Sequence, residues 1–154
     1  MRRIRDYILE EVIGRGAYST VFRCSSLTDP PKYYACKVFK RSRMNQRMLK
    51  NLHEESTSLK KLSGNPNIIN ALASFKTKKN FYLVVEFCNG GDLESLIEAG
   101  LQLSERQVSY IFREVLRGMK EMNSKGILHR DIKNANILIH LTGSNSETNR
   151  RGSS

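Results

Sequence analysis

The chain has 154 residues and a formal net charge of +11, a length that suffices for one ordinary domain with a hydrophobic core. No apolar run approaches the roughly 20 residues that cross a bilayer, and no apolar segment follows the charged N-terminus. We therefore expect an intracellular protein without a membrane span, in the cytoplasm, with the nucleus as an open alternative.

The three cysteines, Cys24, Cys36 and Cys88, are scattered and show no Cys-x-x-Cys spacing. An odd number without paired spacing argues against a disulfide framework and against a zinc site. We expect three reduced thiols.

Basic clusters such as Lys40-Arg41-Ser42-Arg43 and Lys76-Thr77-Lys78-Lys79 contribute to the positive charge and suggest a nucleic-acid surface as one interpretation. They flank apolar strand-like runs and lack the interleaved aromatic residues that stack on bases. We favour solvated turns and expect no nucleic-acid partner.

The first two predicted strands cover residues 7–13 and 20–24, with a glycine-containing turn between them. In a dinucleotide-binding fold such a turn opens a helix, whereas β-branched and aromatic residues follow here. Gly14 and Gly16 would let the backbone approach a phosphate closely. A simple hairpin turn is the alternative.

A third strand is predicted over residues 32–39, where alternation places Tyr33, Ala35, Lys37 and Phe39 on one face. A lysine among apolar neighbours needs an anion, because an unpaired buried ammonium is costly. A lysine at a sheet edge is the alternative interpretation.

A carboxylate partner for Lys37 is sought on the helix predicted over residues 46–62. Leu52 and Leu59 mark its apolar face, and Glu55 lies on that face, three residues after the first and four before the second. Glu54 is rotated away by about 100°. We predict a Lys37–Glu55 ion pair, with Glu54 as the fallback.

Two more strands, over residues 68–75 and 81–87, bring the count to five strands and one helix. A short helix is then expected over residues 92–99, and a long one begins at the capping box of Ser104 and Gln107 and ends at Lys125-Gly126. Its apolar positions repeat at three and four residues, and we interpret all of them as core: Val108, Ile111, Phe112, Val115, Leu116, Met119 and Met122.

The densest polar cluster is His129-Arg130-Asp131-Ile132-Lys133-Asn134-Ala135-Asn136, directly before the strand-like run of residues 137–139. A loop at the mouth of a strand is a frequent place for chemistry. An ordinary turn built from common turn residues is the alternative.

This cluster resembles the catalytic loop of the protein kinases, His-Arg-Asp followed four residues later by Asn. Two further stretches are similar to kinase motifs in the expected order: Gly14-x-Gly16-x-x-Ser19-x-Val21, with Ser19 in place of the third glycine, and Ala35-x-Lys37. The resemblance implies an α+β protein-kinase-like fold: a five-stranded antiparallel small lobe with one long helix, and the first helices of the large lobe.

The resemblance also implies catalytic roles. Asp131 would accept the proton of the substrate hydroxyl, Lys133 would neutralise charge on the transferred phosphoryl group, and Asn136 would bind Mg²⁺. Lys37, held by Glu55, would bind the α- and β-phosphates of ATP. Lys133 is the choice of serine/threonine kinases, so the implied reaction is transfer of the ATP γ-phosphate to hydroxyls of a protein substrate.

The implied nucleotide contacts are a further set of residues. The gatekeeper would be Val85, the hinge hydrogen bonds would come from Glu86 and Cys88, and Asp92 would bind the ribose or cap a helix. The remaining members, around the phosphates and the adenine, are Ile13, Gly14, Gly16, Tyr18, Ser19, Val21, Ala35 and Leu138.

We predict a partial kinase domain over residues 1–139: a small lobe over 1–85, a hinge over 86–91, a partial large lobe over 92–139, and a disordered tail over 140–154. The stretch over residues 87–93 is most similar to the autophagy-initiating kinases. No aspartate follows Asp131, so the metal-binding carboxylate of Asp-Phe-Gly is missing and the domain is expected to be truncated.

Two alternatives follow from the missing carboxylate. The chain could be a non-catalytic ATP-binding or kinase-interaction module that binds a partner protein through the exposed face of the long large-lobe helix. It could also be an incomplete gene product.

Overall fold

The computed structural model describes residues 1–29 and 32–141. These residues form two compact units, the first made of residues 1–87 and 102–131, the second of residues 88–101 and the described part of 132–154. The predicted division into lobes and hinge remains a prediction.

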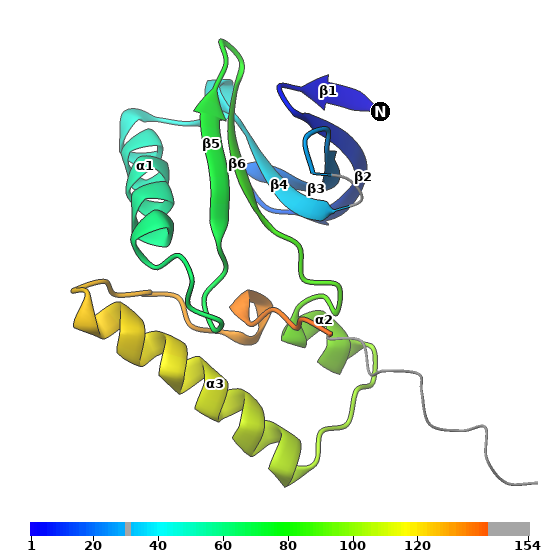
Figure 1. The fold of residues 1–154 in the computed structure, drawn as a ribbon, viewed down its shortest axis with the longest axis vertical. Coiled ribbons are helices and arrows are strands. Elements are labelled where there is room, and N and C mark those ends of the chain that lie inside the picture. Colours follow the sequence, from blue (N-terminus) through cyan, green and yellow to red (C-terminus); the bar gives the residue numbers. More distant parts are fainter. Residues whose placement is uncertain (30–31, 142–154) are drawn as a thin grey trace, which may run out of the picture. The chain divides into compact units, whose positions relative to one another are not determined.

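The first unit contains a curled sheet in which every neighbouring pair of strands is antiparallel, in the order β1-β2-β3-β4-β6-β5 (Figure 1). Its strands are β1 (Arg2–Ile4), β2 (Tyr7–Arg15), β3 (Ser19–Ser26), β4 (Tyr33–Lys40), β5 (Ala71–Lys76) and β6 (Asn80–Glu86). The predicted antiparallel α+β architecture is confirmed.

The predicted count of five strands is wrong by one, because β1 adds an edge strand. It pairs with β2 from Arg2↔Leu9 to Ile4↔Tyr7. A stretch of three residues, two of them arginine, is too short for its hydrophobic pattern to indicate a strand. The strand forms only because this stretch pairs with β2. Arg5 follows at a left-handed φ of 50° and reverses the chain.

The strand predicted over residues 68–75 begins later, at Ala71. The Asn65 side-chain oxygen accepts from the backbone N–H of Asn67 at 2.8 Å, and the Asn65 backbone carbonyl accepts from that of Ile68 at 3.3 Å, which holds this stretch as a turn. The asparagine side chain and backbone together therefore take up N–H groups that a longer strand would offer to the sheet.

Both faces of the sheet are packed, as the period of two predicts. One face buries Leu9, Cys24, Cys36, Tyr82 and others in a first cluster. The opposite face carries Ala35, Leu83 and Val85, with the partly buried Val21 and Phe39 beside them.

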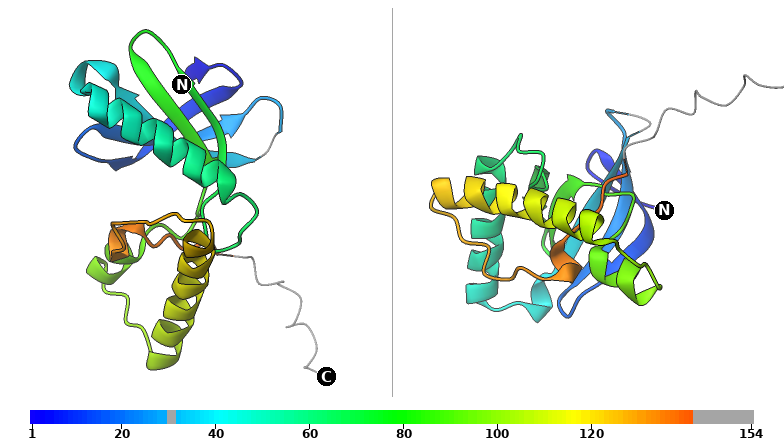
Figure 2. Two further views of the ribbon diagram at one scale, coloured as in Figure 1. Left: turned by 90° about the vertical axis from the view of Figure 1, so that its left-hand side faces the viewer. Right: turned by 90° about the horizontal axis from the view of Figure 1, so that it is seen from below.

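The helix α1 (Gln46–Lys61) lies against β5 and follows the predicted bounds closely (Figure 2). Asn45 caps it by accepting from the backbone N–H of Met48 at 2.9 Å. Leu52 and Ser56 are buried, and the Ser56 hydroxyl donates to that of Ser74 on β5 at 2.9 Å. A short 3₁₀ helix, η1 (Arg41–Arg43), precedes it.

The long helix α3 (Glu105–Ser124) has both hydrogen bonds of the predicted capping box. It meets the turn before β5 at Asn67, whose Nδ2 donates to Glu114 Oε2 at 2.8 Å. The backbone of that turn passes so close to Gly118 that a Cβ there would lie 3.0 Å from the Asn67 carbonyl oxygen.

The prediction that the apolar residues of α3 are all core is wrong. Phe112 is 64% exposed and Leu116 is 60% exposed, and Val108 and Met119 are exposed as well. A wide apolar stripe shows that a helix needs covering, but periodicity alone does not provide the covering surface. None of the helices in the described ranges is long and apolar enough to span a membrane.

The second unit contains α2 (Leu93–Glu98) and the 3₁₀ helix η2 (Asn134–Asn136). The predicted strand over residues 137–139 is instead an isolated antiparallel bridge between Asp92 and Leu138. Of the predicted tail, residues 142–154 lie outside the described residues, and Leu141 exchanges two hydrogen bonds with the Asn89 side chain.

Candidate functional site

The glycine turn joins β2 and β3 as a hairpin, and its predicted contact with phosphate remains a prediction. Its backbone closes as a hairpin, with the Gly16 N–H donating to the Ser19 carbonyl at 2.9 Å. Gly14 lies opposite Val21 in the register. Tyr18, at the tip, is 54% exposed, so the turn presents its backbone and one aromatic ring to solvent.

The glycines of this turn differ in how tightly they are packed. A Cβ at Gly14 would touch only the Val21 side chain, at an ordinary 3.6 Å. One at Gly16 would lie 3.1 Å from Ser19 Oγ, tighter than most real contacts. Hence the protein by itself needs glycine at position 16 more than at position 14.

Lys37 forms the predicted ion pair with Glu55, with 3.7 Å between Nζ and Oε1. Glu54, the fallback partner, instead pairs with Lys50 at 3.9 Å, one helical turn away. The assumption that the pair is buried is wrong, since the side chains are 41% and 43% exposed. The lysine ammonium is therefore positioned by a carboxylate and still open to a further anion.

The predicted adenine contacts on the sheet are register neighbours. Ala35 lies opposite Val85 across β4 and β6, and Val21 lies opposite Lys37 across β3 and β4. Val85 is 2% exposed and belongs to the sheet face that carries Ala35. Ile13, by contrast, is 43% exposed. The sheet thus brings an apolar surface and the Lys37 ammonium onto one face.

Glu86, at the end of β6, is fixed by Asn70. Its backbone N–H donates to the Asn70 carbonyl at 3.0 Å, and its carboxylate accepts from the Asn70 backbone N–H at 2.8 Å. The side chain is therefore used structurally, and the predicted contact of the Glu86 backbone with adenine remains a prediction.

The His129-Arg130-Asp131 stretch closes the first unit with an unusual backbone. Arg130 adopts φ of 66°, a left-handed conformation that is strained for a residue with a long side chain. The Asp131 N–H donates to His129 Nδ1 at 3.3 Å. Such strain persists only where the surroundings impose it, and it concentrates at functional sites.

Asp92, in the second unit, is the N-cap of α2. Its two carboxylate oxygens accept from the Ser95 backbone N–H and from the Ser95 hydroxyl, both at 2.8 Å. The hydrogen bond from the Ser95 backbone, aided by that of its hydroxyl, lowers the pKa of the Asp92 carboxyl below its ordinary value. The capping role proposed from the sequence is confirmed.

Residues 89–93 and 137–141 of the second unit are joined by backbone hydrogen bonds. Gly90 N–H donates to the Ile139 carbonyl at 2.9 Å, Ile139 N–H to Gly91 at 2.8 Å, and Leu93 N–H to Ile137 at 2.9 Å. A Cβ at Gly90 would lie 2.8 Å from the Ile139 carbonyl oxygen. Only glycine fits this close approach.

Leu138 is 45% exposed, whereas its two neighbours in this segment are partly buried. The Cys88 carbonyl accepts from the Gly91 N–H at 3.4 Å. Lys133 and Asn136 bracket η2, and the Asn136 N–H donates to the Lys133 carbonyl at 2.9 Å. The 3₁₀ turn therefore fixes the spacing of these two polar residues.

Residues 7–146 match the family model described as the protein kinase domain, which is most of the chain. The chain belongs to the protein kinase family. The match includes the three motifs that indicated this family from the sequence: the glycine turn, the strand with Ala35 and Lys37, and the stretch over residues 129–136.

The relatives of this kinase chain are serine/threonine-protein kinases and calcium-dependent protein kinases. Serine/threonine-protein kinase PKH2 of Saccharomyces cerevisiae is 34% identical over 88% of the chain, and serine/threonine-protein kinase ATG1 of Candida glabrata is 32% identical over 89%. Calcium-dependent protein kinase 29 of Arabidopsis thaliana is 31% identical over 86%. The chain spans only 13%, 17% and 25% of these proteins, respectively. The similar identities define the serine/threonine-kinase family and no subgroup.

Kinases of this family use ATP with Mg²⁺. Within residues 1–29 and 32–141 no group of three or more His, Cys, Asp or Glu side chains could hold a metal ion. The metal contact of Asn136 remains a prediction from the resemblance. The sheet face with Lys37 does suit a nucleotide, because it combines apolar side chains with an accessible cation.

Sequence reasoning missed three features. Neither the strained φ of Arg130 nor the close approach at Gly90 leaves a periodic signal. The hydrogen bond from Asn67 to Glu114 joins residues far apart in the chain. Of the three, only the close approach at Gly90 left a signal in the sequence, namely a glycine without an evident role in a turn.

Proposed function

We propose that this chain forms the nucleotide-binding part of a serine/threonine protein kinase that transfers the γ-phosphate of ATP to protein hydroxyls. The observation that carries the proposal is the Lys37–Glu55 ion pair, 3.7 Å apart and about two-fifths exposed. An exposed pair contributes roughly 0–1 kcal/mol to stability, so stability alone does not explain it. We explain the ion pair by the need to orient an ammonium group that binds phosphate.

The nucleotide interacts with the sheet through two kinds of group. The Lys37 ammonium binds phosphate oxygens as a charge-assisted donor, and the glycine turn offers its backbone. Ala35, Val21 and Val85 present the apolar surface for the base. The contacts of Ile13, Ser19, Glu86, Cys88, Asp92 and Leu138 stay predictions from the resemblance.

Phosphoryl transfer needs a proton acceptor and charge neutralisation. We assign Asp131 as the acceptor of the substrate hydroxyl proton, Lys133 as the cation for the transferred phosphoryl group, and Asn136 as one metal ligand. Mg²⁺, when bound, would neutralise the phosphate charge that these side chains leave. The acceptor group of the protein substrate is a serine or threonine hydroxyl.

Nucleotide binding is tested by calorimetry with Mg-ATP on Glu55→Gln and on the matched control Glu54→Gln. We expect Glu55→Gln to weaken ATP binding at least about tenfold, since an unoriented lysine loses most of a charge-assisted contact. Glu54→Gln should leave it unchanged, because this carboxylate pairs with Lys50. Equal effects in both variants would refute the assignment.

Phosphoryl transfer is tested with radiolabelled ATP and a generic basic protein substrate. Activity that disappears in Asp131→Asn, with ATP binding retained, supports the enzyme. ATP binding without transfer in the unmodified chain supports the second candidate instead.

The second candidate is a non-catalytic ATP-binding or kinase-interaction module. The exposed apolar residues of α3, including Tyr110, Phe112 and Leu116 at 60% or more, favour a partner protein there. Phe112→Ser combined with Leu116→Ser should then abolish co-sedimentation with the partner while leaving ATP binding intact. The cytoplasmic location stays a prediction.

A further inference from the structure

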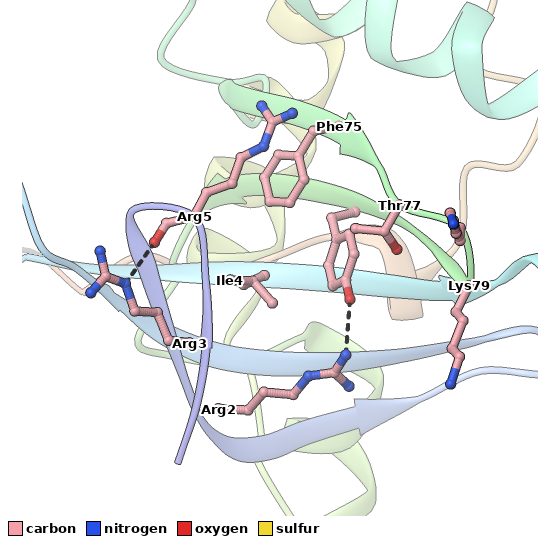
Figure 3. Close-up of a pocket in the computed structure, with 9 residues that line it drawn as sticks. Arg2, Arg3, Ile4, Arg5, Phe75, Thr77 and Lys79 are labelled. Carbon is pink, nitrogen blue, oxygen red and sulfur yellow. Dashed lines mark hydrogen bonds between the residues drawn. The ribbon is translucent and has the colours of Figure 1, made fainter.

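A hollow of about 490 Å³ lies between β1 and the turn that joins β5 to β6. It lies within the first unit, away from the residues to which the nucleotide is assigned. Figure 3 shows the arginines of β1 and its turn on one side and the β5–β6 turn with Lys79 on the other. Its lining consists of Arg2, Arg3, Ile4, Arg5, Phe75, Thr77, Lys78, Lys79 and Tyr82.

The charge of this hollow is of one sign. Five of its nine lining residues are cationic and none is acidic. Among the ion pairs between described residues, none includes any of these five side chains, although other arginines and lysines of the sheet and helices have partners. Like charges gathered without counter-charges repel each other, and a bound anion removes that repulsion.

Two of the five cations, Arg2 and Arg5, have contacts within the protein that position them before any anion binds. The Arg2 guanidinium donates to the Tyr82 hydroxyl at 3.5 Å, and that of Arg5 stacks 4.5 Å above the centre of the Phe75 ring. The left-handed φ of 50° at Arg5 places this residue in the turn between β1 and β2. A side chain already ordered loses less entropy when it binds a ligand.

The opposite rim is tied by hydrogen bonds. Thr77 and Asn80 close the β5–β6 turn, with the Thr77 N–H donating to the Asn80 carbonyl at 2.8 Å. Arg41, the first residue of η1, binds the turn through its side chain, which donates to the Thr77 carbonyl at 3.1 Å, and through its backbone N–H, which donates to the Lys79 carbonyl at 2.9 Å. Lys78 and Lys79 are therefore presented on a fixed backbone.

An edge of the sheet runs beside the hollow. In the strand order β1 comes first and pairs only with β2 among the described strands, so its other edge is available. Extended peptides bind such edges by adding main-chain hydrogen bonds, while neighbouring pockets select side chains. The charged hollow beside β1 thus suits one phosphorylated side chain of an extended segment.

We propose that this hollow, with the free edge of β1, binds an extended segment of a partner protein that carries a phosphorylated serine or threonine. Phosphate is a dianion with three acceptor oxygens, which matches several arginine and lysine donors. The aromatic rings are unsuitable for stacking on nucleic-acid bases, since Phe75 is 7% exposed and Tyr82 is fully buried. The apolar lining residue Ile4 is buried too, so it cannot insert into a membrane.

The test measures fluorescence anisotropy of a short fluorescein-labelled peptide of alternating valine and aspartate with one central phosphothreonine. The full chain should bind it at least about tenfold more tightly than the same peptide with threonine. The variant Lys78→Glu with Lys79→Glu should lose at least about tenfold in affinity. The control Arg47→Glu with Lys120→Glu makes the same change in net charge at exposed helix positions outside the hollow. It should bind the phosphopeptide as tightly as the unmodified chain.

Three results would overturn the proposal. Equal weakening by the two double variants would assign binding to net charge alone. Equal binding of the phosphorylated and unphosphorylated peptides would show that the hollow does not recognise phosphate. Binding of single-stranded RNA or of vesicles containing polyphosphoinositides with the same dependence on Lys78 and Lys79, and no binding of the phosphopeptide, would assign the hollow to those ligands. Thermal unfolding of each variant verifies that it is folded, and we expect each variant to bind ATP like the unmodified chain.

Discussion

Replacing Gly90 by alanine tests whether the close approach of residues 89–93 and 137–141 holds the second unit together. The added Cβ would lie 2.8 Å from the Ile139 carbonyl oxygen and 2.9 Å from its Cγ2, so the segment has to move. That motion disrupts the hydrogen bond of 2.9 Å from Gly90 N–H to the Ile139 carbonyl and the bond of 2.8 Å from Ile139 N–H to the Gly91 carbonyl. Overpacking costs about 1–3 kcal/mol and each hydrogen bond about 1 kcal/mol, so a local loss of about 3 kcal/mol is expected.

Native-state hydrogen exchange measures this loss directly. The Ile139 amide should exchange roughly 100-fold faster in Gly90→Ala, because about 1.4 kcal/mol corresponds to a factor of ten. The control is Gly14→Ala, whose Cβ meets only a side chain at 3.6 Å and should leave this amide unchanged. Unchanged protection of Ile139 in Gly90→Ala would refute the steric argument.

Three further predictions concern stability and reactivity. Asp92→Ala should cost about 1 kcal/mol and speed amide exchange at Ser95; because the Asp92 pKa is lowered, its contribution is complete above the unfolded value of about 3.9 and is lost as the pH falls through the folded pKa, which an NMR titration detects. Gly118→Ala should destabilise the protein by about 1–3 kcal/mol in urea, although alanine favours helix, because its Cβ would press on the Asn67 carbonyl at 3.0 Å; equal or greater stability would contradict this. The Cys36 thiol should resist a water-soluble thiol reagent until unfolding, because its hydrogen bond with the neighbouring cysteine and its burial raise its pKa; rapid reaction in the native state would contradict this.

Much of the candidate site could be predicted because its signals are local. The spacing of Glu55 between two leucines identified the partner of Lys37 correctly over its neighbour Glu54. The same argument overestimated burial, since a helical stripe indicates which face turns inward and says nothing of how deeply its end is covered. The predicted roles of Asp131, Lys133 and Asn136 rest on the motif and await the activity assay.

The sequence by itself determined the protein kinase family, the alternating strands of the sheet and the capped N-termini of α2 and α3. Capping and alternation depend on residues within one or two turns of each other, so a single chain displays them in full. The tertiary structure alone decided that residues 2–4 form an edge strand, that Phe112 lies in solvent and that five cations gather around one hollow. These features depend on which distant surfaces meet, and the charge or apolarity of a residue does not specify what will lie opposite it.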